Sequence, residues 1–135
     1  MVSLIEILKN TPQGERLCHQ LEQVKKAAIP LLAKITETFP EYTVHDIRHS
    51  EMVVDILNWL VPDDLKQVFN AYEIYLLVMS AYLHDIGMVD FPELLDEDFD
   101  PFKTREKRKM LDITDEEIKR KYIRERHQLR SEQFI

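Results

Sequence analysis

Histidine and aspartate side chains are spaced in this sequence as the ligands of one metal ion would be. His45 and His49 are four residues apart in HDIRH. On a helix that spacing places the two imidazoles about 40° apart, on one face. His84 and Asp85 are adjacent, and neighbours on a regular helix point about 100° apart. They can converge on one ion only where the helix ends, and Gly87 two residues later favours such an end.

Each of these patterns also has a plainer interpretation. The pair His45 and His49 can arise by chance on a helix surface, and a buried His84 beside Asp85 can form an ordinary hydrogen-bonded pair. A metal cation would make the burial of a carboxylate much easier. The spacing also matches the His-Glu-x-x-His motif of zinc proteases, with Asp46 in place of the glutamate. Aspartate is one methylene shorter and a poor general base there, so the protease hypothesis carries little weight.

A second group of candidate residues lies near the carboxyl end. One stripe of the expected last helix has spacings of four, three and four, and should face inward; it consists of Ile123, His127, Arg130 and Phe134. A lone histidine on such a face is usually a core residue. The arginines around it, Arg124, Arg126 and Arg130, could hold an anionic substrate or could simply be solvated.

The elements that would position these residues are helical nearly throughout. Only 2 glycines occur, which disfavours a turn-rich all-β fold, so we predict an all-α bundle of about six helices. The chain opens with a Ser-x-x-Glu capping box, and Pro30 should kink or break the second helix. The helix before His84 is apolar nearly all round and should be the most buried. The expected helices are 3–10, 11–38, 43–60, 63–69, 71–85 and one from the Thr-Asp-Glu-Glu box at 114–117 to the end.

The segment between the last two helices changes character. Residues 90–102 are strongly acidic and residues 103–110 strongly basic. We expect 96–112 to be an exposed connection that either has no function or forms a lid over a site.

Composition limits the class of function. The 135 residues suit one domain, 1–135, and 44% hydrophobic with 32% charged residues is ordinary for a globular protein. The net charge of −7 argues against general binding of nucleic acid or anionic membranes. The single cysteine, Cys18, excludes an internal disulfide, and the amino terminus is too short and too charged for a signal peptide or membrane span. We therefore expect a cytoplasmic domain.

Two quoted stretches carry a family resemblance. YTVHDIRHSEMVVDIL, followed by SAYLHDIGM, resembles the HD-domain superfamily of metal-dependent phosphohydrolases over about residues 40–90. The resemblance extends more weakly to IRERHQLRSEQFI. It implies an all-α fold with His49, His84 and Asp85 as ligands of a divalent ion, which could be Mn, Fe, Zn, Ni or Mg.

The resemblance also implies roles for other residues. His45 is similar in position to the general acid of related cyclic-nucleotide phosphodiesterases, and Asp85 would take part in catalysis as well as ligation. His127 would bind a second metal or a phosphate. Arg124 and Arg130 would contact a small phosphorylated substrate, expected to be a nucleotide.

One departure from the family pattern leaves alternatives open. The family's final aspartate ligand follows on a later helix, and no aspartate follows His127. We therefore expect either the N-terminal portion of a longer HD protein or a degenerate member. The function that the resemblance implies is hydrolysis of a phosphoester. The alternatives are an incomplete HD remnant that binds a ligand or oligomerises, and a helical interaction domain with structural histidines. A homo-oligomer or contact with a missing C-terminal region is the expected protein partner.

Overall fold

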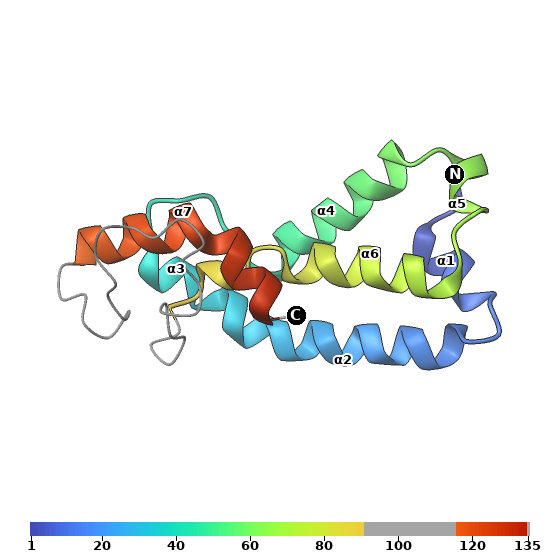
Figure 1. Ribbon diagram of the computed structural model, residues 1–135, viewed down its shortest axis with the longest axis horizontal. Helices are drawn as coiled ribbons and strands as arrows, with labels where there is room; N and C mark the ends of the chain where they lie inside the picture. Colours follow the sequence, from blue (N-terminus) through green and yellow to red (C-terminus); the bar gives the residue numbers. More distant parts are fainter. Residues whose placement is uncertain (91–115, 135) are drawn as a thin grey trace.

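The protein is all-helical in the part that the computed structural model describes, residues 1–90 and 116–134 (Figure 1). No strand occurs in these residues, which confirms the predicted fold class. The helices are α1 (Leu4–Lys9), α2 (Gly14–Ala33), α3 (Ile35–Thr38), α4 (Ile47–Leu60), α5 (Asp63–Lys66), α6 (Ala71–Leu83), the 3₁₀ helix η1 (Ile86–Met88) and α7 (Glu116–Phe134). No helix in these two ranges is long and apolar enough to cross a bilayer.

The core lies where α6 packs between α2 and α4. In Figure 1, α2 and α6 run in the same direction and α4 returns in the opposite one. Ile74 and Val78 of α6 are fully buried, as are Leu4 and Leu8 of α1, which covers one end of the pair. Burial of one such side chain stabilises the fold by about 1.5–3 kcal/mol. This core determines where the carboxyl end of α6 and the amino end of α4 meet.

Several helix boundaries differ from the predicted ones. The second helix continues through Pro30, and the break comes at Lys34, between α2 and α3. The third predicted helix begins at Ile47 instead of residue 43, because Asp46 has extended backbone angles and accepts a hydrogen bond from the Arg48 N–H. An aspartate in that geometry is an N-cap, which marks the true start of a helix.

The helix caps explain the start of α1 and α6. The predicted capping box of Ser3 and Glu6 is present, with both reciprocal hydrogen bonds. A second box, which we did not predict, joins Asn70 and Glu73 at the start of α6. These caps satisfy backbone N–H groups that have no partner within the helix.

Helix α7 packs mainly against η1, the short turn that follows α6. Gly87 makes this contact possible, since a Cβ atom there would lie 2.0 Å from the His127 carbonyl oxygen. We had predicted that Gly87 releases the chain at the helix end. The structure gives a different reason for a glycine at this position, which is the close approach of α7. The predicted connection at 96–112 and the capping box at 114–117 lie wholly or partly outside the described residues.

Candidate metal centre

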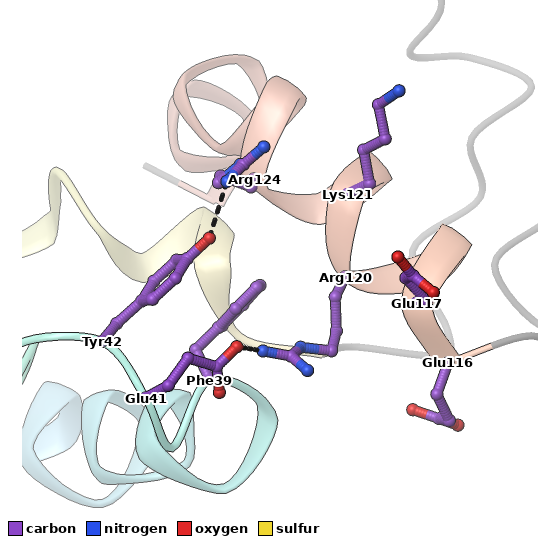
Figure 2. Close-up of a pocket in the computed structure, with 8 residues that line it drawn as sticks. All are labelled: Phe39, Glu41, Tyr42, Glu116, Glu117, Arg120, Lys121 and Arg124. Atoms are coloured by element: carbon purple, nitrogen blue, oxygen red, sulfur yellow. Dashed lines mark hydrogen bonds and ion pairs between the residues drawn. The ribbon is translucent and has the colours of Figure 1, made fainter.

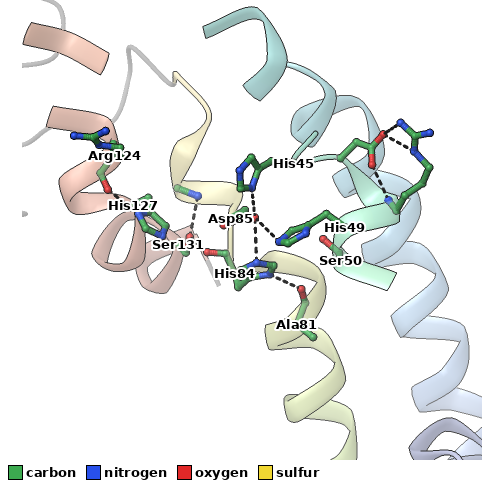
Figure 3. A network of polar contacts seen from close by, with 12 residues as sticks. His45, His49, Ser50, Ala81, His84, Asp85, Arg124, His127 and Ser131 are labelled. Carbon is green, nitrogen blue, oxygen red and sulfur yellow. Dashed lines mark hydrogen bonds and ion pairs between the residues drawn. The ribbon is translucent and has the colours of Figure 1, made fainter. Parts of the chain in front are cut away.

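Three histidines surround one oxygen of a buried carboxylate (Figure 3). His45 Nδ1 lies 2.9 Å from Asp85 Oδ2, His84 Nε2 lies 3.0 Å from it and His49 Nε2 lies 3.4 Å from it. Asp85 is only 5% exposed, whereas the three imidazoles are partly exposed. The structure thus brings together the four residues that the two sequence motifs singled out.

His45 reaches this cluster by a route that the sequence analysis did not predict. It precedes α4 in non-helical backbone, so the helical spacing argument for His45 and His49 was wrong. The capping conformation of Asp46 turns the chain between them, and the two rings still meet with centroids 5.1 Å apart. A zinc-protease motif needs both histidines on one helix, so the structure removes that alternative.

The convergence of His84 and Asp85 follows the predicted reason. Helix α6 ends at Leu83, His84 is its C-cap, and Asp85 has φ −99° and ψ 0°. Outside the regular helix the two neighbouring side chains no longer point about 100° apart. His84 Nδ1 lies 2.8 Å from the Ala81 carbonyl oxygen. Because a carbonyl can only accept, Nδ1 donates to Ala81, and Nε2, which faces the Asp85 carboxylate, donates to that oxygen. On losing this proton, Nε2 would present its lone pair to an ion, with Nδ1–H still held by the carbonyl, as in many metal-binding histidines.

The cluster shifts the pKa values of its members. Burial raises the pKa of Asp85, but hydrogen bonds from His84 and His45 outweigh burial and lower it to about 2. The hydrogen bond to Asp85 raises the pKa of His84 above its ordinary value, with burial opposing. Burial lowers the pKa of His49, although the charge of Asp85 opposes this. The carboxylate is therefore ionised at neutral pH and available to a cation.

The donor atoms fit a divalent ion. Imidazole nitrogen and carboxylate oxygen bind such ions at about 2.0–2.2 Å, which puts neighbouring donors roughly 3.0–3.4 Å apart. The separations of the three imidazole nitrogens from Asp85 Oδ2 fall between 2.9 and 3.4 Å. One donor atom from each of His45, His49 and Asp85 lies within 4.8 Å of the other two. Mixed nitrogen and oxygen ligands suit borderline or hard divalent ions.

His127 and Arg124 lie on α7 beside this cluster (Figure 3). His127 Nδ1 donates to the Arg124 carbonyl oxygen at 2.7 Å, so its Nε2 is the atom with the lone pair. The group of three metal-binding candidates among the described residues is His45, His49 and Asp85, so His127 lies outside it, as does His84. Its assignment to a second metal or a phosphate stays a prediction.

Arg130 was predicted to contact a substrate. The residue is 1% exposed, and its side chain donates from Nε to the Gly87 carbonyl oxygen and from Nη2 to that of Val89. These bonds support the backbone of the turn, and a contact with substrate stays a prediction. The neighbouring Ser131, which sequence analysis missed, is also buried and bonds to the turn after α6. Its single hydroxyl gave no pattern that could have identified it.

A cavity of about 520 Å³ opens between the segment before α4 and the first turns of α7 (Figure 2). Arg124 lines it and donates to the Tyr42 hydroxyl at 2.7 Å. Arg120 pairs with Glu41 and lies over the Phe39 ring. Pockets of about 300–1,000 Å³ hold most small-molecule ligands. The lining residues are Phe39, Glu41, Tyr42, Glu116, Glu117, Arg120, Lys121 and Arg124.

Comparison with known proteins identifies the family. The model of the HD-CE family matches residues 39–135, which include all four residues of the cluster. Neither the curated proteins nor the solved structures contain a significant match. The match covers most of the chain and agrees with the His-Asp cluster at the end of α6. The chain therefore belongs to the HD-CE family and carries an HD-type domain.

Proposed function

We propose that this domain is a metal-dependent phosphohydrolase that cleaves a phosphoester, with a nucleotide as the substrate class. The observation that carries the proposal is the ionised Asp85 oxygen with three imidazole nitrogens 2.9–3.4 Å from it. Such a cluster is costly to assemble for structure alone, because the ring of His49 contacts the rings of both His45 and His84, and neighbouring imidazoles disfavour one another's protonated forms.

In this proposal, His49, His84 and Asp85 hold the ion. When bound, a divalent ion polarises a phosphoryl oxygen and lowers the pKa of a coordinated water. His84 is oriented for binding by its bond to Ala81, and Asp85 stays ionised because its pKa is about 2.

The proposed role of His45 has two versions. Its Nδ1 lies as close to Asp85 as any donor in the cluster, which favours a fourth ligand. The family resemblance favours a general acid, in which His45 would give a proton to the leaving oxygen. A ligand is needed for ion binding, whereas a general acid is needed only for turnover. The variant His45→Ala therefore separates the two roles.

The proposed substrate region is the cavity beside α7. Arg124 is its best anion contact, because the hydrogen bond that positions it goes to the neutral Tyr42 hydroxyl. Arg120 is paired with Glu41, so its charge is largely neutralised. The cavity volume of about 520 Å³ suits a nucleotide-sized molecule.

The test combines metal analysis with hydrolysis of phosphoester substrates after loading with Mn²⁺. Asp85→Asn and His84→Ala should abolish both bound ion and turnover. His19→Ala is the matched control, since His19 is exposed and its Nε2 lies 3.1 Å from Nε2 of Gln23. Failure of the wild-type chain to bind Mn²⁺, Fe²⁺, Zn²⁺, Ni²⁺ or Mg²⁺ would contradict the proposal. Stoichiometric ion without turnover would instead support the alternative, an HD remnant that binds a ligand.

A further inference from the structure

Two buried residues of α7, Arg130 and Ser131, hold the turn that carries the candidate ligands. Figure 3 shows Ser131 beside this turn. Ser131 Oγ accepts a hydrogen bond from the Gly87 N–H at 2.9 Å and donates to the His84 carbonyl oxygen at 2.7 Å. Arg130 donates to the carbonyl oxygens of Gly87 and Val89 at 2.7 and 2.8 Å. Together these four hydrogen bonds hold the backbone from His84 to Val89, and we call Arg130 and Ser131 the α7 clamp.

The turn and α7 depend on each other for these contacts. Buried backbone groups without hydrogen-bond partners cost about 1–3 kcal/mol each. If α7 moved away, the Gly87 N–H and three carbonyl oxygens would lose the partners described above. The absence of a side chain at Gly87 lets the two backbones approach closely enough for the hydrogen bonds of Ser131. A Cβ atom at Gly87 would lie 2.6 Å from the Ser131 backbone nitrogen and 2.8 Å from the Arg130 Cβ, which is too close.

The location of these bonds relates them to the metal centre. His84 supplies its ring nitrogen to the cluster, and its own carbonyl oxygen accepts the bond from Ser131. Asp85 lies between His84 and the clamped Gly87 in the chain. A backbone held on both sides of Asp85 limits the angles at which the two ligand side chains can leave it.

We propose that Ser131 and Arg130 are positioning residues of the metal centre, so that ion binding by His84 and Asp85 is coupled to the docking of α7. This inference rests on the proposed function only in requiring that the cluster binds an ion. Coupling of this kind is reciprocal: a docked α7 raises ion affinity, and a bound ion stabilises the docking of α7. Supporting partners outside the ligand set commonly change metal affinity by 10- to 100-fold.

The first measurement is the dissociation constant for Mn²⁺ by titration calorimetry. Ser131→Ala should weaken binding about 10-fold or more, and Arg130→Met should weaken it at least as much. Ser131→Thr, which keeps the hydroxyl, should recover part of the affinity. Glu132→Gln is the matched control, because Glu132 is the exposed neighbour of Ser131 on the same helix. Circular dichroism verifies that each variant stays helical at the temperature used.

The second measurement uses the wild-type chain and Asp85→Asn, so it does not depend on whether the Ser131 and Arg130 variants fold. Amide hydrogen exchange of wild-type α7 should slow when Mn²⁺ is added, and should not change in Asp85→Asn. A pure structural role would leave exchange in α7 unaffected by the ion.

The outcomes separate this inference from the proposed function. If wild-type protein binds Mn²⁺ but the clamp variants bind it equally well and α7 exchange is unchanged, the coupling is wrong and the metal centre stands. If no ion binds to the wild-type chain, both are wrong. If Mn²⁺ slows exchange in α7 and the clamp variants bind it weakly, the coupling holds even where phosphoester turnover is absent.

Discussion

At the residue scale, the central feature is one carboxylate oxygen shared by three imidazoles. Burial alone would favour the protonated form of Asp85, yet its pKa is lowered to about 2 because His84 and His45 donate to it. The carboxylate is thus charged, and a cation that binds it must displace the protons that the histidines donate to it. The protonation state of the imidazoles therefore controls the affinity of the site for a metal ion.

This balance predicts how ion affinity varies with pH. The pKa of His84 is raised above 6.5, so its proton is present at pH 6 and must leave before Nε2 can bind an ion. The affinity for Mn²⁺ should therefore rise between pH 6 and pH 8, with release of protons. Titration calorimetry in two buffers of different ionisation enthalpy measures both. An affinity that stays constant over this range would contradict the prediction.

The same carboxylate predicts an acid limit for the ion-free chain. The folded pKa of Asp85, about 2, lies below its ordinary 3.8, so its stabilising effect is complete above pH 3.8 and is lost as pH falls towards 2. The effect is at most roughly 2–3 kcal/mol. The difference in unfolding free energy between wild type and Asp85→Asn, measured with urea, should shrink from pH 5 to pH 2.5. A constant difference would mean that Asp85 has an unperturbed pKa.

At the element scale, α6 positions the cluster because both of its ends are defined. Asn70 accepts from the N–H groups of Tyr72 and Glu73 at its start, and the chain leaves the helix at His84. Four buried aliphatic or aromatic residues of α6 hold its angle against α2 and α4: Ile74, Val78, Tyr82 and Leu83.

The amino cap gives a prediction for the stability of α6. Replacing Asn70 by alanine removes two hydrogen bonds to backbone N–H groups and should lower the unfolding free energy by about 1 kcal/mol. Asn70→Asp keeps the acceptor and should be nearly neutral. Gln67→Ala, at an exposed position before α6, is the control for urea unfolding. An equal loss in the Asp and Ala variants would show that the cap is not the cause.

At the scale of the whole molecule, α4 and the segment from α5 to Val68 present large apolar side chains to solvent. Trp59 is 73% exposed and Val68 is 76% exposed, whereas the buried residues of α4 are Ser50, Val54 and Asn58. Large exposed apolar patches often mark interaction surfaces. Six large side chains contribute: Met52, Ile56, Trp59, Leu60, Leu65 and Val68. Interfaces of standard size bury about 800 Å² per partner and often centre on tryptophan.

We expect this surface to join two copies of the chain, which was one of the partners expected from the sequence. Sedimentation velocity should show a concentration-dependent dimer, and Trp59→Glu should weaken it at least 10-fold. The unfolding free energy of the monomer should change by less than about 0.5 kcal/mol, because most of the Trp59 surface is exposed to solvent. Glu51→Gln is the control at the polar edge of α4, where Glu51 pairs with Lys25. A monomer at all concentrations would contradict the expectation.

The sequence by itself determined the helical class, the capping box at Ser3, and the four residues of the candidate centre. Each of these depends on residues close in the chain, where periodicity and the end of an apolar helix act locally. The HD-type motifs were readable for the same reason, since each spans a few residues.

Only the tertiary structure decided how those residues meet. His45 joins the cluster from non-helical backbone because Asp46 caps α4, which helical spacing could not reveal. Arg130 and Ser131 bond to a turn 41 to 47 residues earlier in the chain, so their roles depend on the docking of α7. Gly87 is needed for that approach and not for a turn. Contacts between residues so far apart in sequence arise from packing, and no local pattern encodes them.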